Sequence, residues 1–98
     1  MGAREFIEES KGQTVKEAFR FAVNEAADEH GYGGYTGSIA EKSIYVYMGT
    51  VDTVEEAYEK AQDYIDEDHP KISDKWGPAG YLQVKDTDIY VFFGYASC

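Results

Sequence analysis

Two stretches of the chain alternate aliphatic and aromatic residues with a period of two. Residues 43–49 read SIYVYMG and residues 88–94 read DIYVFFG, so nearly the same pattern occurs twice. A period of two is typical of a β-strand, because successive side chains point to opposite faces of its sheet. We expect the largely aliphatic face to pack on helices: Ile44, Val46, Met48, Ile89, Val91 and Phe93. We expect the aromatic face to point away from them: Tyr45, Tyr47, Tyr90 and Phe92.

Two other segments place apolar residues at the three- and four-residue spacing of an amphipathic helix. Each begins with a capping box, a threonine followed three residues later by a glutamate, at Thr14 with Glu17 and at Thr53 with Glu56. The pattern predicts helices over residues 15–30 and 54–68. Gly31 ends the first because glycine readily adopts the left-handed conformation, and Pro70 ends the second.

Shorter segments complete the expected sheet. Residues 4–9 carry charges that suit an edge strand, and residues 38–41 are expected to pair with 43–49 through a tight turn. Residues 81–85 and 88–95 predict a terminal hairpin with Asp86 and Thr87 at its turn. The glycine-rich residues 31–37 and the Trp76 segment, residues 71–80, are expected to be loops.

The helices repeat as well as the strands. Residues 14–19 match residues 53–58 without a gap, at an offset that also aligns Ile7 with Val46. Duplication, convergence and chance likeness all remain open as causes. Two strand-helix-strand halves predict an α+β fold, a ferredoxin-like β-α-β-β-α-β sandwich with an additional C-terminal strand, and both helices on one face of an antiparallel sheet.

The composition fits a single domain over residues 1–98. A formal net charge of −10 disfavours direct binding to nucleic acid or to anionic membranes and favours a basic partner. The chain begins without the apolar run of a signal peptide or a membrane span, so we expect a cytoplasmic protein. The single cysteine, Cys98, is expected to be an unpaired thiol.

Two surfaces are candidates for binding a protein partner. The first is the aromatic face, Tyr45, Tyr47, Tyr90 and Phe92, whose ring tips suit a protein interface or a homodimer; half-exposed tyrosines without a role are the alternative. The second is the acidic surface of the second helix, which imitates nucleic-acid phosphates or is simply a solvated face. Its residues are Glu55, Glu56, Glu59, Asp63, Asp66, Glu67 and Asp68.

The sequence contains no spaced set of residues that indicates catalysis or a cofactor, and we expect no enzyme activity, no cofactor and no metal. Two clusters with histidine, residues 28–30 and 67–69, have a generic spacing. A favourable interaction of histidine with a helix end explains them more simply than a metal site does.

Residues 31–42, GYGGYTGSIAEK, resemble a group of small acidic bacteriophage-encoded proteins of uncharacterised function; residues 17–19 and 75–80 extend the likeness. Small acidic phage proteins are often inhibitors of host machinery, including anti-CRISPR and other anti-defence proteins, so the resemblance implies a biological context. It implies no role for any residue.

Two hypotheses about function follow. The first is a non-enzymatic, phage-encoded protein of the host cytoplasm that binds and inhibits a basic nucleic-acid-handling host protein, using the acidic helix and the aromatic face. The alternative is a small homodimeric enzyme or ligand-binding module with a pocket on the aromatic sheet face.

Overall fold

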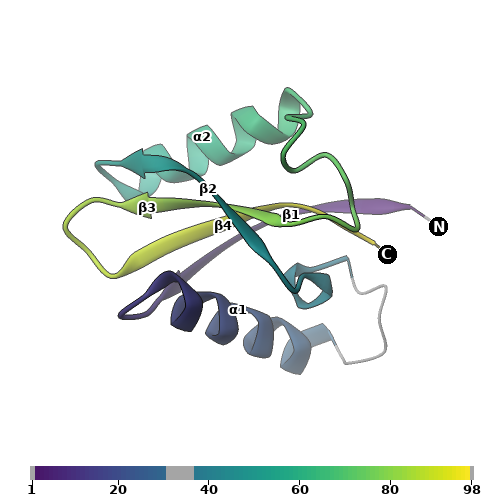
Figure 1. The fold of residues 1–98 in the computed structure, drawn as a ribbon, viewed down its shortest axis with the longest axis horizontal. Coiled ribbons are helices and arrows are strands. Elements are labelled where there is room, and N and C mark those ends of the chain that lie inside the picture. The colour runs from purple at the N-terminus through teal and green to yellow at the C-terminus, as the bar shows by residue number, and fades with distance from the viewer. Residues whose placement is uncertain (1, 31–36, 98) are drawn as a thin grey trace.

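The chain folds into three layers, a β-sheet between two α-helices. A computed structural model describes residues 2–30 and 37–97, without the side chain of His30. Helix α1 (Val15–His30) lies below the sheet and α2 (Val54–Asp66) lies above it in Figure 1. The expected glycine-rich loop lies outside the described residues except for Gly37, and so does Cys98.

Both helices begin at their predicted capping boxes. Thr14 Oγ1 accepts a hydrogen bond from the Glu17 amide at 3.2 Å, and Thr53 Oγ1 accepts one from the Glu56 amide at 3.1 Å. Each glutamate carboxylate also accepts a hydrogen bond from the amide that precedes its threonine, at 3.2 Å in α1 and 3.3 Å in α2. These bonds satisfy amides that a helix leaves without an internal partner, so sequence alone sets both helix starts.

The sheet has the strand order β1-β4-β3-β2. Its strands are β1 (Ala3–Lys11), β2 (Tyr45–Val51), β3 (Ala79–Val84) and β4 (Ile89–Ser97). β4 runs antiparallel to both β1 and β3, whereas β2 runs parallel to β3. The predicted hairpin is confirmed as β3 and β4, and Asp86 at its turn has a φ of 61°.

The α+β class is confirmed, since two helices pack on one four-stranded mixed sheet. The helix count and strand order are compatible with a ferredoxin-like fold that carries an additional strand. The additional C-terminal strand is β4, and it lies inside the sheet between β1 and β3.

Two details of the predicted architecture are wrong. The sheet is mixed, because α2 is long enough to carry the chain back so that β3 runs parallel to β2. The helices also lie on opposite faces, since alternate residues of β4 belong to separate cores: Phe92 packs with α1, and Val91 and Phe93 pack with α2.

The direction of the chain explains why the helices lie on opposite faces. From β1 to β2 the chain crosses the whole sheet, and from β2 to β3 it steps back toward β1. Right-handed crossovers made in opposite directions place their helices on opposite faces of the sheet. The central strand β4 is therefore buried on both sides (Figure 1).

The segment before β2 is a third correction. Residues 38–41 form no strand; Ile39–Glu41 is a short 3₁₀-helix, η1, and the side chain of Ser38 caps it by accepting a hydrogen bond from the Ala40 amide at 3.2 Å. Such a serine bond to the local backbone competes with strand pairing. β2 consequently pairs with β3 on one side, and no other described strand pairs with it.

Buried Lys42 fixes the loop that leads into β3. Its Nζ donates hydrogen bonds to the carbonyl oxygens of Lys75 at 3.0 Å and Gly77 at 2.9 Å. Burial lowers the pKa of the Lys42 ammonium, and the nearby Asp74 carboxylate opposes this shift. The lysine thereby anchors the loop against η1; the loop was predicted over residues 71–80 and ends at residue 78, because β3 begins at Ala79.

Candidate functional site

The acidic surface of α2 is exposed as the sequence predicts. Glu55, Glu59, Asp63 and Asp66 recur every three or four residues, so they form one stripe along the helix. The buried face is made by Ala57, Ala61 and Ile65, which pack on the sheet. The remaining acidic residues of the predicted set, Glu56, Glu67 and Asp68, are exposed beside the stripe or at its end.

Strand β1 adds carboxylates to the same side of the molecule. Ile7 packs in the core under α2, and the alternation of the strand places Glu5 and Glu9 on that face. The Tyr58 hydroxyl of α2 donates a hydrogen bond to Glu9 Oε1 at 3.4 Å. Burial raises the pKa of Tyr58, and the carboxylates of Glu9 and Glu8 raise it further.

Tyr95 lies close to several carboxylates at the other end of α2. Its hydroxyl donates a hydrogen bond to the Ile65 carbonyl oxygen at 2.6 Å. Burial raises the pKa of Tyr95, and the carboxylates of Asp68, Glu5 and Asp66 contribute to the rise. We use the name acidic face for the stripe on α2 together with five further carboxylates, those of Glu56, Glu67, Asp68, Glu5 and Glu9.

Glu5 and Glu9 are not among the site residues that the sequence predicts. The charges of β1 predict only the protection of an edge strand. The repeat contained the missing signal, because it aligns Ile7 with Val46 and so assigns Glu5 and Glu9 to the aliphatic face of the sheet.

The end of α2 holds acidic residues where they reduce stability. The described last turn contains no basic residue, and Asp63, Asp66 and Glu67 lie near the carbonyl end of the helix dipole. The helix is two residues shorter than predicted because Asp68 has a φ of 53°, in the left-handed region that favours glycine.

An Asp68→Gly variant is expected to be more stable than the natural protein by about 0.5–1 kcal/mol, because glycine relieves the backbone strain and removes a charge that the helix end disfavours. Thermal unfolding followed by circular dichroism measures the gain as a rise of a few degrees in Tm. Asp86→Gly is the matched control, since Asp86 is also left-handed but lies in a hairpin. A lower Tm for Asp68→Gly than for the natural protein would contradict the expectation.

The aromatic side chains of β2 and β4 share one face of the sheet, as predicted, but α1 packs on that face. Tyr90 is 7% exposed and Phe92 is 0% exposed, because α1 covers them. The expectation that these two residues point away from the helices is therefore wrong. Tyr45 is half-buried against Phe19 of α1, with their ring centroids 4.9 Å apart, and only Tyr47 is largely exposed, at 52%.

Tyr81 lies in the middle of these rings. Its ring centroid is 5.7 Å from that of Tyr45, 5.5 Å from that of Tyr47 and 6.0 Å from that of Tyr90. Burial raises the pKa of Tyr81, and the neighbouring phenols raise it further. The ring contacts show that Tyr81 packs with the tyrosines of β2 and β4 as one aromatic cluster.

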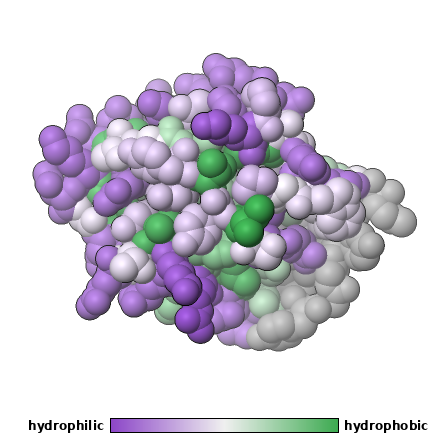
Figure 2. Space-filling model, viewed as in Figure 1, coloured by the Kyte–Doolittle hydropathy of each residue, from purple (hydrophilic) through white to green (hydrophobic). Residues whose placement is uncertain are grey.

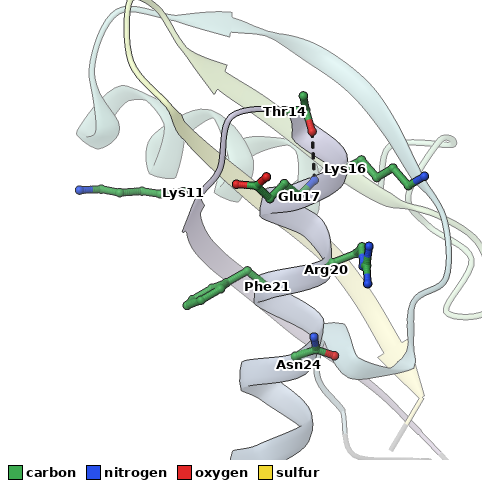
Figure 3. A pocket seen from close by; sticks show the side chains of 7 residues that line it. All are labelled: Lys11, Thr14, Lys16, Glu17, Arg20, Phe21 and Asn24. Atoms are coloured by element: carbon green, nitrogen blue, oxygen red, sulfur yellow. Dashed lines mark hydrogen bonds between the residues drawn. The ribbon is translucent and has the colours of Figure 1, made fainter.

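A hollow of about 470 Å³ lies beside the first half of α1 (Figure 3). Figure 3 shows that its basic side chains diverge: Lys11 points to the side of Phe21, whereas Lys16 and Arg20 point to the other side. Glu17, which caps the helix, lies between them. The cations do not converge on a common point, so the hollow lacks the geometry of an anion site.

Other site chemistry is limited among the described residues. No group of three or more His, Cys, Asp or Glu side chains in residues 2–30 and 37–97 could hold a metal ion. His69 instead accepts a hydrogen bond at Nδ1 from the Lys71 amide at 3.2 Å. Of the predicted clusters, residues 28–30 include His30, whose side chain lies outside the description.

Comparison with protein-family models, with curated proteins and with solved structures gave no match. Within the described part of the chain, no helix is long and apolar enough to cross a membrane. The acidic face and the exposed ring of Tyr47 are therefore the features from which a function has to be inferred.

Proposed function

We propose that this chain is a non-enzymatic acidic interaction protein that binds and inhibits a basic, nucleic-acid-handling protein. The observation that carries the proposal is the acidic face, in which carboxylates of α2 and β1 lie exposed on one side of a chain with a net charge of −10. A dense array of carboxylates offers a basic groove the same charge pattern as nucleic-acid phosphates.

The cost in stability at the end of α2 supports a functional role. Acidic residues near the carbonyl end of a helix, and an aspartate in the left-handed region, both reduce stability. Natural proteins commonly lose stability where a surface serves binding. The residues concerned, Asp63, Asp66, Glu67 and Asp68, all belong to the acidic face.

The resemblance of residues 31–42 to phage proteins gives the proposal its context. We propose a phage-encoded inhibitor of the anti-CRISPR or another anti-defence type, which acts in the host cytoplasm. Of the predicted aromatic residues, Tyr47 and the half-buried Tyr45 are accessible to a partner, and both lie on β2 at the rim of the α1 side.

The alternative, a homodimeric enzyme or ligand-binding module, needs a pocket on the aromatic face. α1 covers Tyr90 and Phe92 there, and the hollow beside the first half of α1 is not lined by Tyr45 or Tyr47. The acidic interaction protein is accordingly the function that the geometry supports better.

Affinity capture from host lysate tests the proposal. The amount of partner captured is expected to fall about tenfold or more between low salt and about 0.5 M NaCl, because exposed charges are screened. Short duplex DNA added as a competitor is expected to displace the protein from its partner. Capture that changes with neither salt nor DNA would contradict the proposal.

A further inference from the structure

The two edges of the sheet differ sharply in charge. β1 carries Arg4, Glu5, Glu8, Glu9 and Lys11 along its length. β2 carries no charged residue, and neither does the segment from Ser43 to its start. Charged side chains are a common device that keeps an edge strand from pairing with another chain, so β1 is protected and β2 lacks this protection.

The β2 edge also exposes apolar side chains. Ile44 is 57% exposed and Tyr47 is 52% exposed. β2 crosses nearest the viewer in Figure 1, and Figure 2 shows separate hydrophobic residues among residues of intermediate hydropathy in the middle of that same view, with more hydrophilic residues toward its rim. This is the surface that a pairing strand would cover.

The backbone of β2 is ready to pair on its open side. The Ile44 and Val51 carbonyl oxygens accept hydrogen bonds from the amides of Ala79 at 3.0 Å and Lys85 at 2.8 Å, so these groups point toward β3. The alternation of a strand then directs the N–H and C=O groups of Tyr45 and Tyr47 to the open side. No other strand of residues 2–30 and 37–97 pairs with this side.

We propose that the open edge of β2 pairs with the β2 edge of a second copy of this chain, antiparallel and centred on Val46. In this register Tyr45 of each copy lies opposite Tyr47 of the other, and the pair exchanges main-chain hydrogen bonds. Ile44 lies opposite Met48 of the second copy, which covers its exposed side chain. Val46 lies opposite itself at the two-fold axis.

A β-bulge limits the length of this pairing. The register between β2 and β3 shifts between Tyr47 and Gly49, and Gly49 has a φ of 141°. A bulge bends its strand away from a flat pairing geometry. The pairing therefore covers residues 44–48, which is the segment that holds the exposed Ile44 and Tyr47.

A second copy fits the β2 edge because this edge is uncharged and can pair antiparallel with its own sequence. Two chains of net charge −10 repel each other at most of their surfaces, and at the β2 edge they meet without like charges opposite one another. The two-fold axis places both copies of α2 on the same face. α2 packs chiefly on β4 and β3, so with strands about 4.8 Å apart the two helices lie roughly 20–25 Å apart. That separation exceeds a Debye length of about 8 Å at physiological salt.

Charge variants at Val46 test the proposal. In sedimentation velocity and light scattering the natural protein is expected to dimerise between micromolar and millimolar concentration. Val46→Lys and Val46→Glu each place like charges opposite one another at the axis and are each expected to be monomeric. An equimolar mixture of the two variants is expected to form a heterodimer, a result that loss of folding could not produce.

The other edge supplies the control. Ile7 of β1 is, like Val46, an aliphatic, half-buried residue of an edge strand, and it packs in the core under α2. An Ile7→Lys variant that remains folded is expected to dimerise as the natural protein does. A natural protein that stays monomeric at millimolar concentration would overturn the proposal. A dimer that both Val46 variants retain would overturn it as well.

A cross-link tests the register. Val46→Cys, in a Cys98→Ser background, is expected to form a disulfide-linked dimer on mild oxidation, because a non-hydrogen-bonded antiparallel pair brings its Cα atoms to about 4.5 Å. Glu9→Cys on β1, in the same background, is expected to remain monomeric. Equal cross-linking of the two variants would contradict the assigned edge.

The dimer does not rest on the proposed inhibitory function, and salt separates the two. Dimerisation is expected to strengthen with rising salt, because screening reduces repulsion between two acidic chains, whereas capture of a basic partner is expected to weaken. A monomer that still captures its partner in a salt-dependent manner would overturn the dimer alone.

Discussion

A Phe92→Ala variant is expected to lose about 3–5 kcal/mol of unfolding free energy, whereas Tyr47→Ala is expected to lose about 1 kcal/mol or less. Phe92 is 0% exposed, and its ring centroid is 5.4 Å from that of Phe19 in α1 and 6.0 Å from that of Tyr81 in β3. Its removal would leave a cavity between α1 and the sheet. Tyr47 is 52% exposed and shares a hydrogen bond of 2.6 Å with exposed Thr50.

Urea unfolding followed by circular dichroism measures both losses. A domain of this size is typically stable by about 5–15 kcal/mol, so Phe92→Ala is expected to lower the urea midpoint severely or to prevent folding. The two residues are equivalent in the sequence pattern, which makes Tyr47→Ala a matched comparison. Similar losses for the two variants would contradict the coverage of the aromatic face by α1.

Charge reversal on α2 is expected to lower affinity for the basic partner by roughly 100-fold or more. The variant combines Asp63→Lys, Asp66→Lys and Glu67→Lys, three exposed positions of the acidic face. Each reversal replaces an attraction by a repulsion in the complex, and close interfacial charge pairs are coupled by about 1.5 kcal/mol or more. Titration calorimetry or surface plasmon resonance with the captured partner measures the change.

The control is a triple reversal on the other helix. Glu25→Lys, Asp28→Lys and Glu29→Lys alter three exposed acidic residues of α1, so the net charge changes by the same amount as in the α2 variant. We expect this control to change the affinity by less than about tenfold, because α1 lies on the opposite face of the sheet. Equal losses would show that overall charge, and not the acidic face, governs binding.

The candidate site was predicted in part. The spacing of Glu55, Glu59, Asp63 and Asp66 along a helix already predicts an exposed stripe, because helical periodicity separates it from the apolar face. The contribution of Glu5 and Glu9 depends on which face of the sheet α2 covers. That depends on packing between segments far apart in the chain.

The aromatic face was predicted with the correct parity but the wrong exposure. Alternation in β2 and β4 separates Tyr45, Tyr90 and Phe92 from Val91 and Phe93, as the two cores confirm. Nothing in that local pattern shows that each face of β4 is covered by a helix. The covering helix follows from the path of the chain, which crosses the sheet in one direction through α1 and returns through α2.

Sequence by itself determined the features that depend on neighbouring residues. The capping boxes set the starts of α1 and α2, alternation assigned the two faces of β2 and β4, and the turn at Asp86 joined β3 to β4. Each of these is specified by backbone and side-chain chemistry within a few residues.

Only the tertiary structure decided the order of the strands, the opposite placement of the helices and the burial of Phe92. The same strand order places β2 at an edge of the sheet, where Ile44 and Tyr47 are exposed. The physical reason is that hydrogen bonds between strands and apolar burial between layers join residues distant in sequence. Local patterns state that a strand must pair and that a face must be covered, but not by which segment.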